Sequence, residues 1–143
     1  MKISTRGRYA MRMMVCLGRS PEEELLPLKE ISNRIHVNAK YLEQIAATLS
    51  RAGLIHVARG STGGYRLNRA PEAYTAWEIL HAVEGSLSPV ACLDSAENAC
   101  EYADRCSTLP FWKELDSVVE TFLREKTLQD IIDSSTQGQE HYN

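Results

Sequence analysis

Three cysteines lie close together in the second half of the chain, within the segment CLDSAENACEYADRC, residues 92–106. Cys92, Cys100 and Cys106 are separated by seven and then five residues. Closely spaced thiolates are soft ligands that suit zinc or an iron–sulfur cluster. The CxxC pairs that are usual in structural zinc sites are missing here, which disfavours such a site. Spacing alone leaves an iron–sulfur cluster, a thiol–disulfide sensor and three ordinary cysteines open.

Length and composition suit one globular domain, since 43% of the 143 residues are hydrophobic and 24% are charged. No apolar run approaches the ~18–20 residues of a membrane span. The N-terminal MKISTRGRYA has no apolar signal core. We therefore expect a cytoplasmic protein with no membrane partner, in which clustered thiols stay reduced and bind metal or act as redox groups.

Charge is divided unevenly along the chain. Residues 1–69 hold 12 Lys and Arg against 5 Glu, a net charge of +7, and residues 70–143 hold 4 Lys and Arg against 14 Asp and Glu, a net charge of -10. The net charge of the whole chain, -3, hides this asymmetry. The basic first half favours nucleic acid as a partner.

Hydrophobic periodicity predicts helices in the basic half. They are expected over residues 3–19, from Pro27 to the turn at 35–38, and from about Ala39 to Ala52. Asn38 is a suitable N-cap for the third helix, and Gly53 can close it in a left-handed cap. Two β-prone runs, Leu54–Ala58 and Tyr65–Leu67, flank the glycine-rich RGSTGG and predict a hairpin. This order of elements is a winged helix-turn-helix.

The acidic half predicts further helices around the cysteines. One opens with the capping-box pattern Thr75–Glu78 and ends at Gly85. A long helix, from about residue 108 to 124, has a broad apolar face that could pair with a second copy, and residues 127–133 predict a short helix. The fold class is mainly α with a small β-hairpin. Its regions are a winged helix-turn-helix (1–85), a cysteine-containing loop (86–107), a dimerisation helix with a short C-terminal helix (108–134) and a disordered tail (135–143).

The third helix and the hairpin carry side chains that can read DNA. In the major groove Lys and Arg read guanine, Asn and Gln read adenine, and Glu accepts from cytosine. The predicted DNA-binding residues are Asn38, Lys40, Tyr41, Glu43, Gln44 and Arg59. Arg59, at the wing tip, would reach a phosphate or a minor groove. The alternative, that these residues form an ordinary solvated helix face, is disfavoured, because the charge asymmetry, the helix spacing and the wing all indicate DNA binding.

Four stretches together resemble IscR-type regulators of the Rrf2 family. They are STRGRYAMRMM, YLEQIAATLSRAGL, VARGSTGGYRL and the cysteine loop followed by FW. The resemblance runs from Met1 to about Ile132 and is specific in this combination. It implies a homodimeric winged-helix repressor or activator that binds a palindromic operator in double-stranded DNA. It also implies that an iron–sulfur cluster controls DNA affinity or specificity, so that the protein senses iron–sulfur status, oxidant or nitric oxide.

The resemblance assigns roles to particular residues. The family's cluster cysteines correspond to Cys92, Cys100 and Cys106. Its base-reading and wing positions correspond to Glu43, Gln44 and Arg59. In the relatives, the helix that matches about Pro110–Arg124 forms the dimer interface. The resemblance favours a 2Fe–2S cluster, while three cysteines with an open fourth position equally allow 4Fe–4S.

Two features depart from the family pattern. The first gap between cysteines is longer than is common in close IscR relatives. The histidine that follows the last cysteine in IscR is replaced by Leu109. Other relatives recruit a ligand of the partner subunit from positions that match Arg8 and Arg12, which cannot ligate as cations. The remaining candidates for a fourth ligand are a distant side chain, a small molecule, or Asp94, Glu97, Glu101 or Asp104.

Three rival functions follow from the same residues. The nearest keeps the DNA binding but makes the cysteines a thiol-based sensor, either metal-free or with zinc. An iron–sulfur electron carrier would explain the loop but neither the basic half nor the wing. An enzyme is disfavoured, because the sequence has no nucleophile–base pairing, phosphate loop or paired acids at useful spacing.

Overall fold

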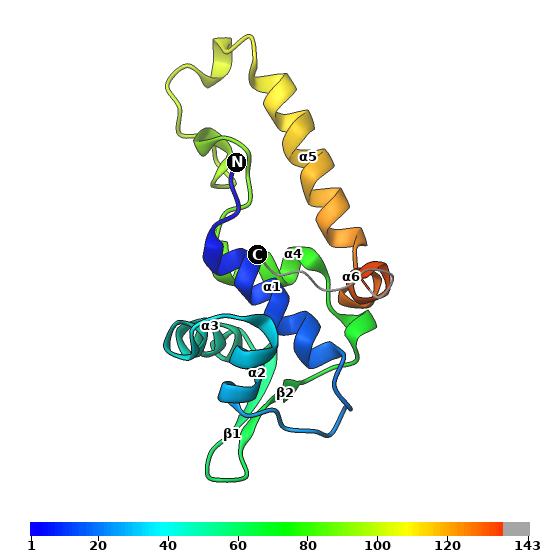
Figure 1. The fold of residues 1–143 in the computed structure, drawn as a ribbon. Coiled ribbons are helices and arrows are strands. Elements are labelled where there is room, and N and C mark those ends of the chain that lie inside the picture. The colour runs from blue at the N-terminus through cyan, green and yellow to red at the C-terminus, as the bar shows by residue number, and fades with distance from the viewer. Residues whose placement is uncertain (136–143) are drawn as a thin grey trace.

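The computed structural model describes residues 1–135 and is mainly helical, with one two-stranded antiparallel hairpin (Figure 1). The elements are α1 (Thr5–Gly18), α2 (Leu28–Ile35), α3 (Ala39–Arg51), β1 (Ile55–Ala58), β2 (Gly64–Leu67), η1 (Pro71–Ala73), α4 (Ala76–Glu84), η2 (Ala91–Leu93), η3 (Ala103–Arg105), α5 (Leu109–Glu125) and α6 (Leu128–Ser135). The predicted winged helix-turn-helix with a long C-terminal helix is confirmed. The predicted disordered tail lies outside the described residues except for Ser135, which instead ends α6. Within residues 1–135, no helix has the length and apolar character to cross a membrane.

The turn between α2 and α3 is fixed by two local features. α2 ends at Ile35, and the next residue, His36, adopts a left-handed backbone conformation with φ of 55°. Asn38 then caps α3, because its side-chain oxygen accepts from the backbone N–H of Lys40 at 2.9 Å and of Tyr41 at 3.2 Å. The predicted N-cap is confirmed, and it fixes where α3 begins.

Helix boundaries differ from the predicted ones by one or two residues. α1 begins at Thr5 because the Ser4 hydroxyl accepts from the Gly7 N–H at 3.1 Å and caps the helix. α2 begins after Pro27, whose ψ of 147° is extended. Gly53 closes α3 with φ of 75°, as predicted.

α1 lies at the centre of the fold, in contact with α2, α3, α4, α6 and β2 (Figure 1). Its residues Ala10, Met13 and Met14 are fully buried. Burying one such methionine side chain stabilises the fold by about 1.5–3 kcal/mol. Leu128 and Ile132 of α6 belong to the same core, so the C-terminal helix packs back onto the helix-turn-helix region.

The wing is held against the body by the segment that precedes α2. β1 pairs with β2 in antiparallel register, and Leu26 exchanges two backbone hydrogen bonds of 2.9 Å with Tyr65. A Cβ atom at Gly64 would lie 2.5 Å from the Leu26 carbonyl oxygen. Only glycine therefore permits this close approach, which fixes the wing beside the start of α2.

The first turn of α4 departs from the predicted capping box. The Thr75 hydroxyl accepts from the Glu78 N–H at 3.1 Å, as expected. The Glu78 carboxylate, however, accepts from the Arg69 guanidinium at 2.7 Å. This acidic side chain thus binds the end of the wing rather than completing the box.

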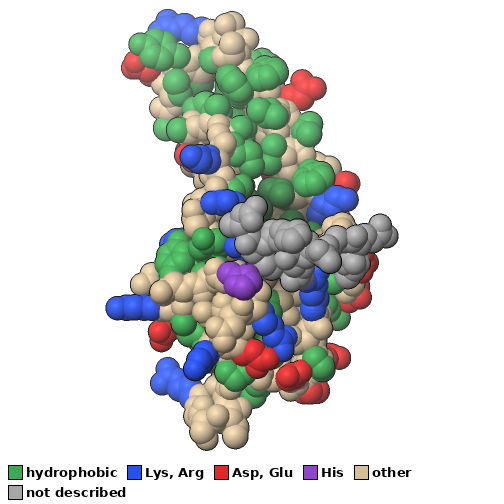
Figure 2. All heavy atoms as spheres, viewed as in Figure 1, with side chains coloured by type: hydrophobic (Ala, Val, Ile, Leu, Met, Phe, Trp, Pro, Cys, Tyr) green, Lys and Arg blue, Asp and Glu red, His purple; other side chains and the backbone are tan. Residues whose placement is uncertain are grey.

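The cysteine loop and α5 form an arm that projects from the body (Figure 1). In α5, only Leu123 is buried within the described part of the chain. Phe111, Val118 and Phe122 are 59%, 62% and 58% exposed. Figure 2 shows hydrophobic side chains gathered over this region. The predicted broad apolar face of the long helix is therefore present and uncovered within residues 1–135.

We predict that Asn38→Ala lowers the free energy of unfolding by about 1 kcal/mol, because α3 loses the acceptor for its first N–H groups. Asn38→Ser keeps an acceptor oxygen and should recover most of that stability. Urea denaturation of the two variants and the wild type provides the measurement. An alanine variant as stable as the wild type would mean that water replaces the cap without cost.

Candidate DNA-binding groove and cysteine loop

An open groove of about 830 Å³ lies between α3 and the wing. Its walls are formed by Glu43, Ala47, Ser50 and Arg51 of α3 and by Val57–Ser61 and Gly63–Tyr65 of the wing. Pro27 and Leu28 complete it at the start of α2. The acidic Glu43 on one wall and the cationic Arg59 on the other thus border the same space.

The other predicted DNA-binding residues lie around this groove. Lys40 and Gln44 are exposed on α3 beside Glu43, and Asn38 is exposed at the start of the helix. Tyr41 is half-buried and contacts the Tyr9 ring edge-on, with centroids 5.8 Å apart. The outer face of α3 is therefore exposed. Contact of these side chains with DNA stays a prediction.

Four polar groove residues are absent from the predicted set, namely Ser50, Arg51, Ser61 and Tyr65. Arg51 follows Glu43 by eight residues, so helical periodicity already placed it on the outer face. Tyr65 gave no such signal, because its position depends on how the wing folds back. Burial raises the pKa of the Tyr65 phenol, and the Glu43 carboxylate raises it further. Tyr65 is therefore a neutral hydrogen-bonding group near Glu43.

The cysteine loop, residues 86–107, is irregular as predicted, apart from the short η2 and η3 turns. Its first part is closed by hydrogen bonds within the loop. The Ser86 hydroxyl donates to the Asp94 carboxylate at 2.6 Å, and the Ser88 hydroxyl donates to the Leu93 carbonyl at 2.8 Å. Cys92 thus sits in a locally ordered part of the loop.

The three loop thiols are accessible but do not converge. Cys92 and Cys106 are half-buried and Cys100 is exposed, and all three are free thiols. Among residues 1–135, no group of three or more His, Cys, Asp or Glu is arranged to hold a metal ion. Three thiolates are a suitable donor set for a cluster, and the loop would have to close to present them together. Cys16, in contrast, is buried in the core.

The groove and the loop lie on a fold that known proteins share. A family model described as "Rrf2: Iron-dependent Transcriptional regulator" matches residues 3–134. The chain belongs to the Rrf2 family. It is 35% identical to the HTH-type transcriptional regulator CymR of Bacillus subtilis over 142 residues, which covers 99% of this chain and 97% of CymR. It is 33% identical to the regulator IscR of Aliivibrio salmonicida over 132 residues, with 92% and 77% covered.

Solved structures of Rrf2-family proteins have the same fold. B. subtilis CymR, described as the global cysteine regulator, gives a TM-score of 0.77 at 34% identity, covering 94% of this chain and 98% of that one. IscR of T. potens gives a TM-score of 0.75 at 28% identity, covering 99% and 95%. The predicted resemblance is confirmed, and this Rrf2-family chain is a transcriptional regulator rather than an enzyme. CymR and IscR match it about equally well.

The loop conformation selects none of the proposed fourth ligands of a cluster. Leu109, at the position of the IscR histidine, is half-buried at the start of α5. The four candidate carboxylates are exposed, and Asp94 already accepts from Ser86. That the three thiols of this Rrf2-family member bind a cluster stays a prediction.

Cys106 is the loop thiol with a distinct electrostatic environment. Its Sγ lies 3.5 Å from the Thr108 hydroxyl oxygen. That hydrogen bond, followed by the backbone N–H groups of Thr108 and Leu109, lowers the pKa of the Cys106 thiol. The thiolate, which is the reactive and metal-binding form, is thus favoured at the start of α5.

We predict that alkylation of Cys106 by iodoacetamide in metal-free protein titrates at lower pH in the wild type than in Thr108→Val, because valine cannot stabilise the thiolate. Mass spectrometry of the Cys106 peptide across a pH series measures the midpoint. Alkylation of the exposed Cys100 in the same samples serves as the internal control for reagent and recovery. Identical Cys106 midpoints in the two proteins would contradict the assigned role of Thr108.

Proposed function

We propose that this chain is a homodimeric DNA-binding transcriptional regulator whose DNA affinity or specificity is controlled by an iron–sulfur cluster on Cys92, Cys100 and Cys106. The observation that supports it best is the groove in which Glu43 of the recognition helix and Arg59 of the wing border one open space. The groove supplies a surface for DNA, and the loop supplies the thiols. Such a regulator would act in the cytoplasm.

In the proposed complex, α3 enters the major groove and the wing follows the neighbouring backbone. Glu43 would accept from cytosine N4 and Gln44 would bond adenine, while Lys40 and Asn38 extend the reading surface toward the start of α3. Arg59 would contact a phosphate or insert in the minor groove. Arg51, on the opposite wall from Arg59, would make a second phosphate contact. Together they would hold one DNA strand between α3 and the wing.

The uncovered face of α5 supports the homodimer. Phe111, Val118 and Phe122 recur at steps of seven and four residues, so they form a single seam along one side of the helix. Each is more than half exposed. A contiguous exposed apolar surface of this kind is typical of an association site. A second copy of α5 offers the matching seam, and a two-fold dimer would read a palindromic operator in double-stranded DNA.

The loop is suited to a cluster by its ligands and by its position. When bound, a cluster would supply a centre whose redox state and iron content depend on the cell. The resemblance to IscR favours 2Fe–2S, and the open fourth position also accommodates 4Fe–4S. The loop begins where α4 ends and finishes where α5 begins. Closing it around any group would therefore act on the relative position of those two helices, and so on the two halves of the dimer.

A thiol switch without a cluster is the second candidate. It is favoured by the lowered pKa of the Cys106 thiol and by the accessibility of Cys92 and Cys100. CymR of Staphylococcus aureus, 30% identical with a TM-score of 0.70, is described in an oxidized form. An electron carrier is not supported, because the chain belongs to a family of transcriptional regulators.

Iron and acid-labile sulfide per chain, measured on protein purified without oxygen together with its visible spectrum, test the cluster. We expect stoichiometric iron and sulfide, and their count separates 2Fe–2S from 4Fe–4S. The matched variants are Cys100→Ala, which should lose the cluster, and Cys16→Ala, which removes a core thiol and should keep it. Failure to acquire either element after anaerobic reconstitution would favour the thiol switch on the same DNA-binding scaffold.

For the groove, we predict that Arg59→Ala weakens specific DNA binding by about 1–3 kcal/mol, as the loss of one good contact does. Glu43→Ala should relax base preference more than it weakens binding to random DNA, since Glu43 reads a base edge. Fluorescence anisotropy on operator and random duplexes measures both. Lys113→Ala, which removes a cation from the exposed arm, is the charge control. An equal loss on both duplexes for Glu43→Ala would exclude base reading.

A further inference from the structure

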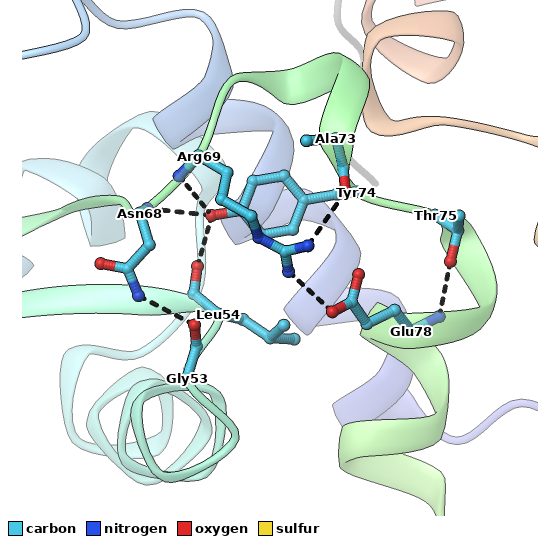
Figure 3. Close-up of polar contacts among 8 residues, drawn as sticks. All are labelled: Gly53, Leu54, Asn68, Arg69, Ala73, Tyr74, Thr75 and Glu78. Atoms are coloured by element: carbon cyan, nitrogen blue, oxygen red, sulfur yellow. Dashed lines mark hydrogen bonds and ion pairs between the residues drawn. The ribbon is translucent and has the colours of Figure 1, made fainter.

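One buried hydroxyl joins both ends of the wing. Tyr74 is fully buried, and its phenol donates to the Leu54 carbonyl at 2.7 Å, just before β1. The same oxygen accepts from the backbone N–H of Asn68 at 2.9 Å and of Arg69 at 3.1 Å, just after β2. Figure 3 shows these bonds converging on one atom. The base of the hairpin is therefore fixed to a single side chain.

Arg69 extends this anchor to α4. Its guanidinium carbon lies 4.2 Å from the centroid of the Tyr74 ring. The guanidinium donates to the Ala73 carbonyl at 3.0 Å and to the Glu78 carboxylate at 2.7 Å (Figure 3). Glu78 is held in turn by the first turn of α4, where its N–H donates to Thr75. The end of the wing is thus tied to the start of α4 by a cation, a ring and a carboxylate.

The opposite side of the same segment holds the end of the arm. The Leu128 N–H donates to the Tyr74 carbonyl at 3.0 Å, and the Ala76 N–H donates to the Lys126 carbonyl at 2.8 Å. Leu128 begins α6 and Lys126 follows α5. Residues 74–76 therefore bind the wing through the Tyr74 side chain and the end of the arm through their backbone.

We infer that Tyr74, Arg69 and Glu78 are positioning residues that set the angle between the wing and α5, and thereby the half-site spacing that the dimer accepts. This inference rests on the proposed homodimer and its paired half-sites. If α5 forms the dimer interface, residues 74–76 fix the position of each protomer's wing relative to that interface. Half-sites are read about 34 Å apart along the duplex, so a small change in the wing angle at this junction changes which spacing fits.

The test uses an operator selected with wild-type protein from random duplexes. Its two half-sites are then separated by spacers that differ by single base pairs, and a duplex with one half-site is included. We expect Glu78→Gln to leave affinity for the single half-site unchanged. The ratio of affinities for the best and the next spacer should fall by about 5-fold or more, the lower range of energetic coupling between sites. Tyr74→Phe, which keeps the ring but loses its hydroxyl, should act in the same direction.

Glu30→Gln is the matched control. It removes a carboxylate from another Arg–Glu pair, Glu30–Arg34 on α2, which lies away from residues 74–76. It should keep the wild-type spacer profile. Sedimentation and thermal unfolding establish that each variant is a folded dimer. Arg69 and Glu78 are only partly buried, so we expect the Glu78→Gln protein to fold. The test can therefore be read from this variant even if Tyr74→Phe fails to fold.

Two results would overturn the inference. One is a folded, dimeric Glu78→Gln protein with the wild-type spacer profile. The other is an equal loss of affinity on every duplex, the single half-site included, because that marks a purely structural role. A wild-type protein that shows no preference for paired half-sites would instead overturn the proposed function, and the positioning role with it.

Discussion

The burial of α1 is the interaction on which the rest of the structure depends. Ala10, Met13 and Met14 are fully buried on one face of this helix, and α2, α3, α4 and α6 all contact it. A core of this density tolerates little change in volume, so its neighbours are held in a defined relation. The helix-turn-helix, α4 and the returning α6 therefore share one core, although they are far apart in sequence.

Within residues 1–135, that common core leaves two faces exposed. The outer face of α3 is polar and opens onto the groove, where Glu43 and Arg59 lie. This face of α5 is apolar, with Val118 62% exposed, because α5 packs against α4 through its other side, at Leu123. A polar concave surface suits the hydrated, charged edge of DNA, whereas an apolar seam suits another protein surface. The two faces thus have different chemistry suited to different partners.

Local sequence signals predicted the helices and strands well, because the interactions that begin and end these elements are local. Asn38 caps α3 through N–H groups only two and three residues away, and Gly53 ends it through its own left-handed backbone. Long-range contacts could not be predicted in the same way. Glu78 has the right spacing for a capping box, yet Arg69 competes for its carboxylate once the wing has folded. A charged partner brought near by tertiary structure outweighs a backbone N–H.

In the candidate site too, features that depend on local sequence could be predicted, and features that depend on long-range contacts could not. Helical periodicity placed Glu43 and Arg51 on one face of α3, since it needs only the helix. Tyr65 reaches the groove because β2 pairs with Leu26, a contact between segments about forty residues apart. The cysteine spacing identified the three thiols of the loop, but it could not show that they lie apart in this conformation. The conformation of the loop depends on its own short-range hydrogen bonds, such as Ser86 to Asp94, which cysteine spacing does not predict.

The charge asymmetry of the chain has a structural meaning beyond an affinity for DNA. Residues 70–143, with a net charge of -10, include the whole arm, and residues 1–69, with +7, include the recognition helix and the wing. In a dimer joined through α5, the two acidic arms would meet and the basic halves would lie outward. Their mutual repulsion is screened over about 8 Å at physiological salt, so the apolar seam has only short-range repulsion to overcome. In the proposed dimer, the same arrangement would repel phosphates from the arm and favour the approach of DNA to the groove.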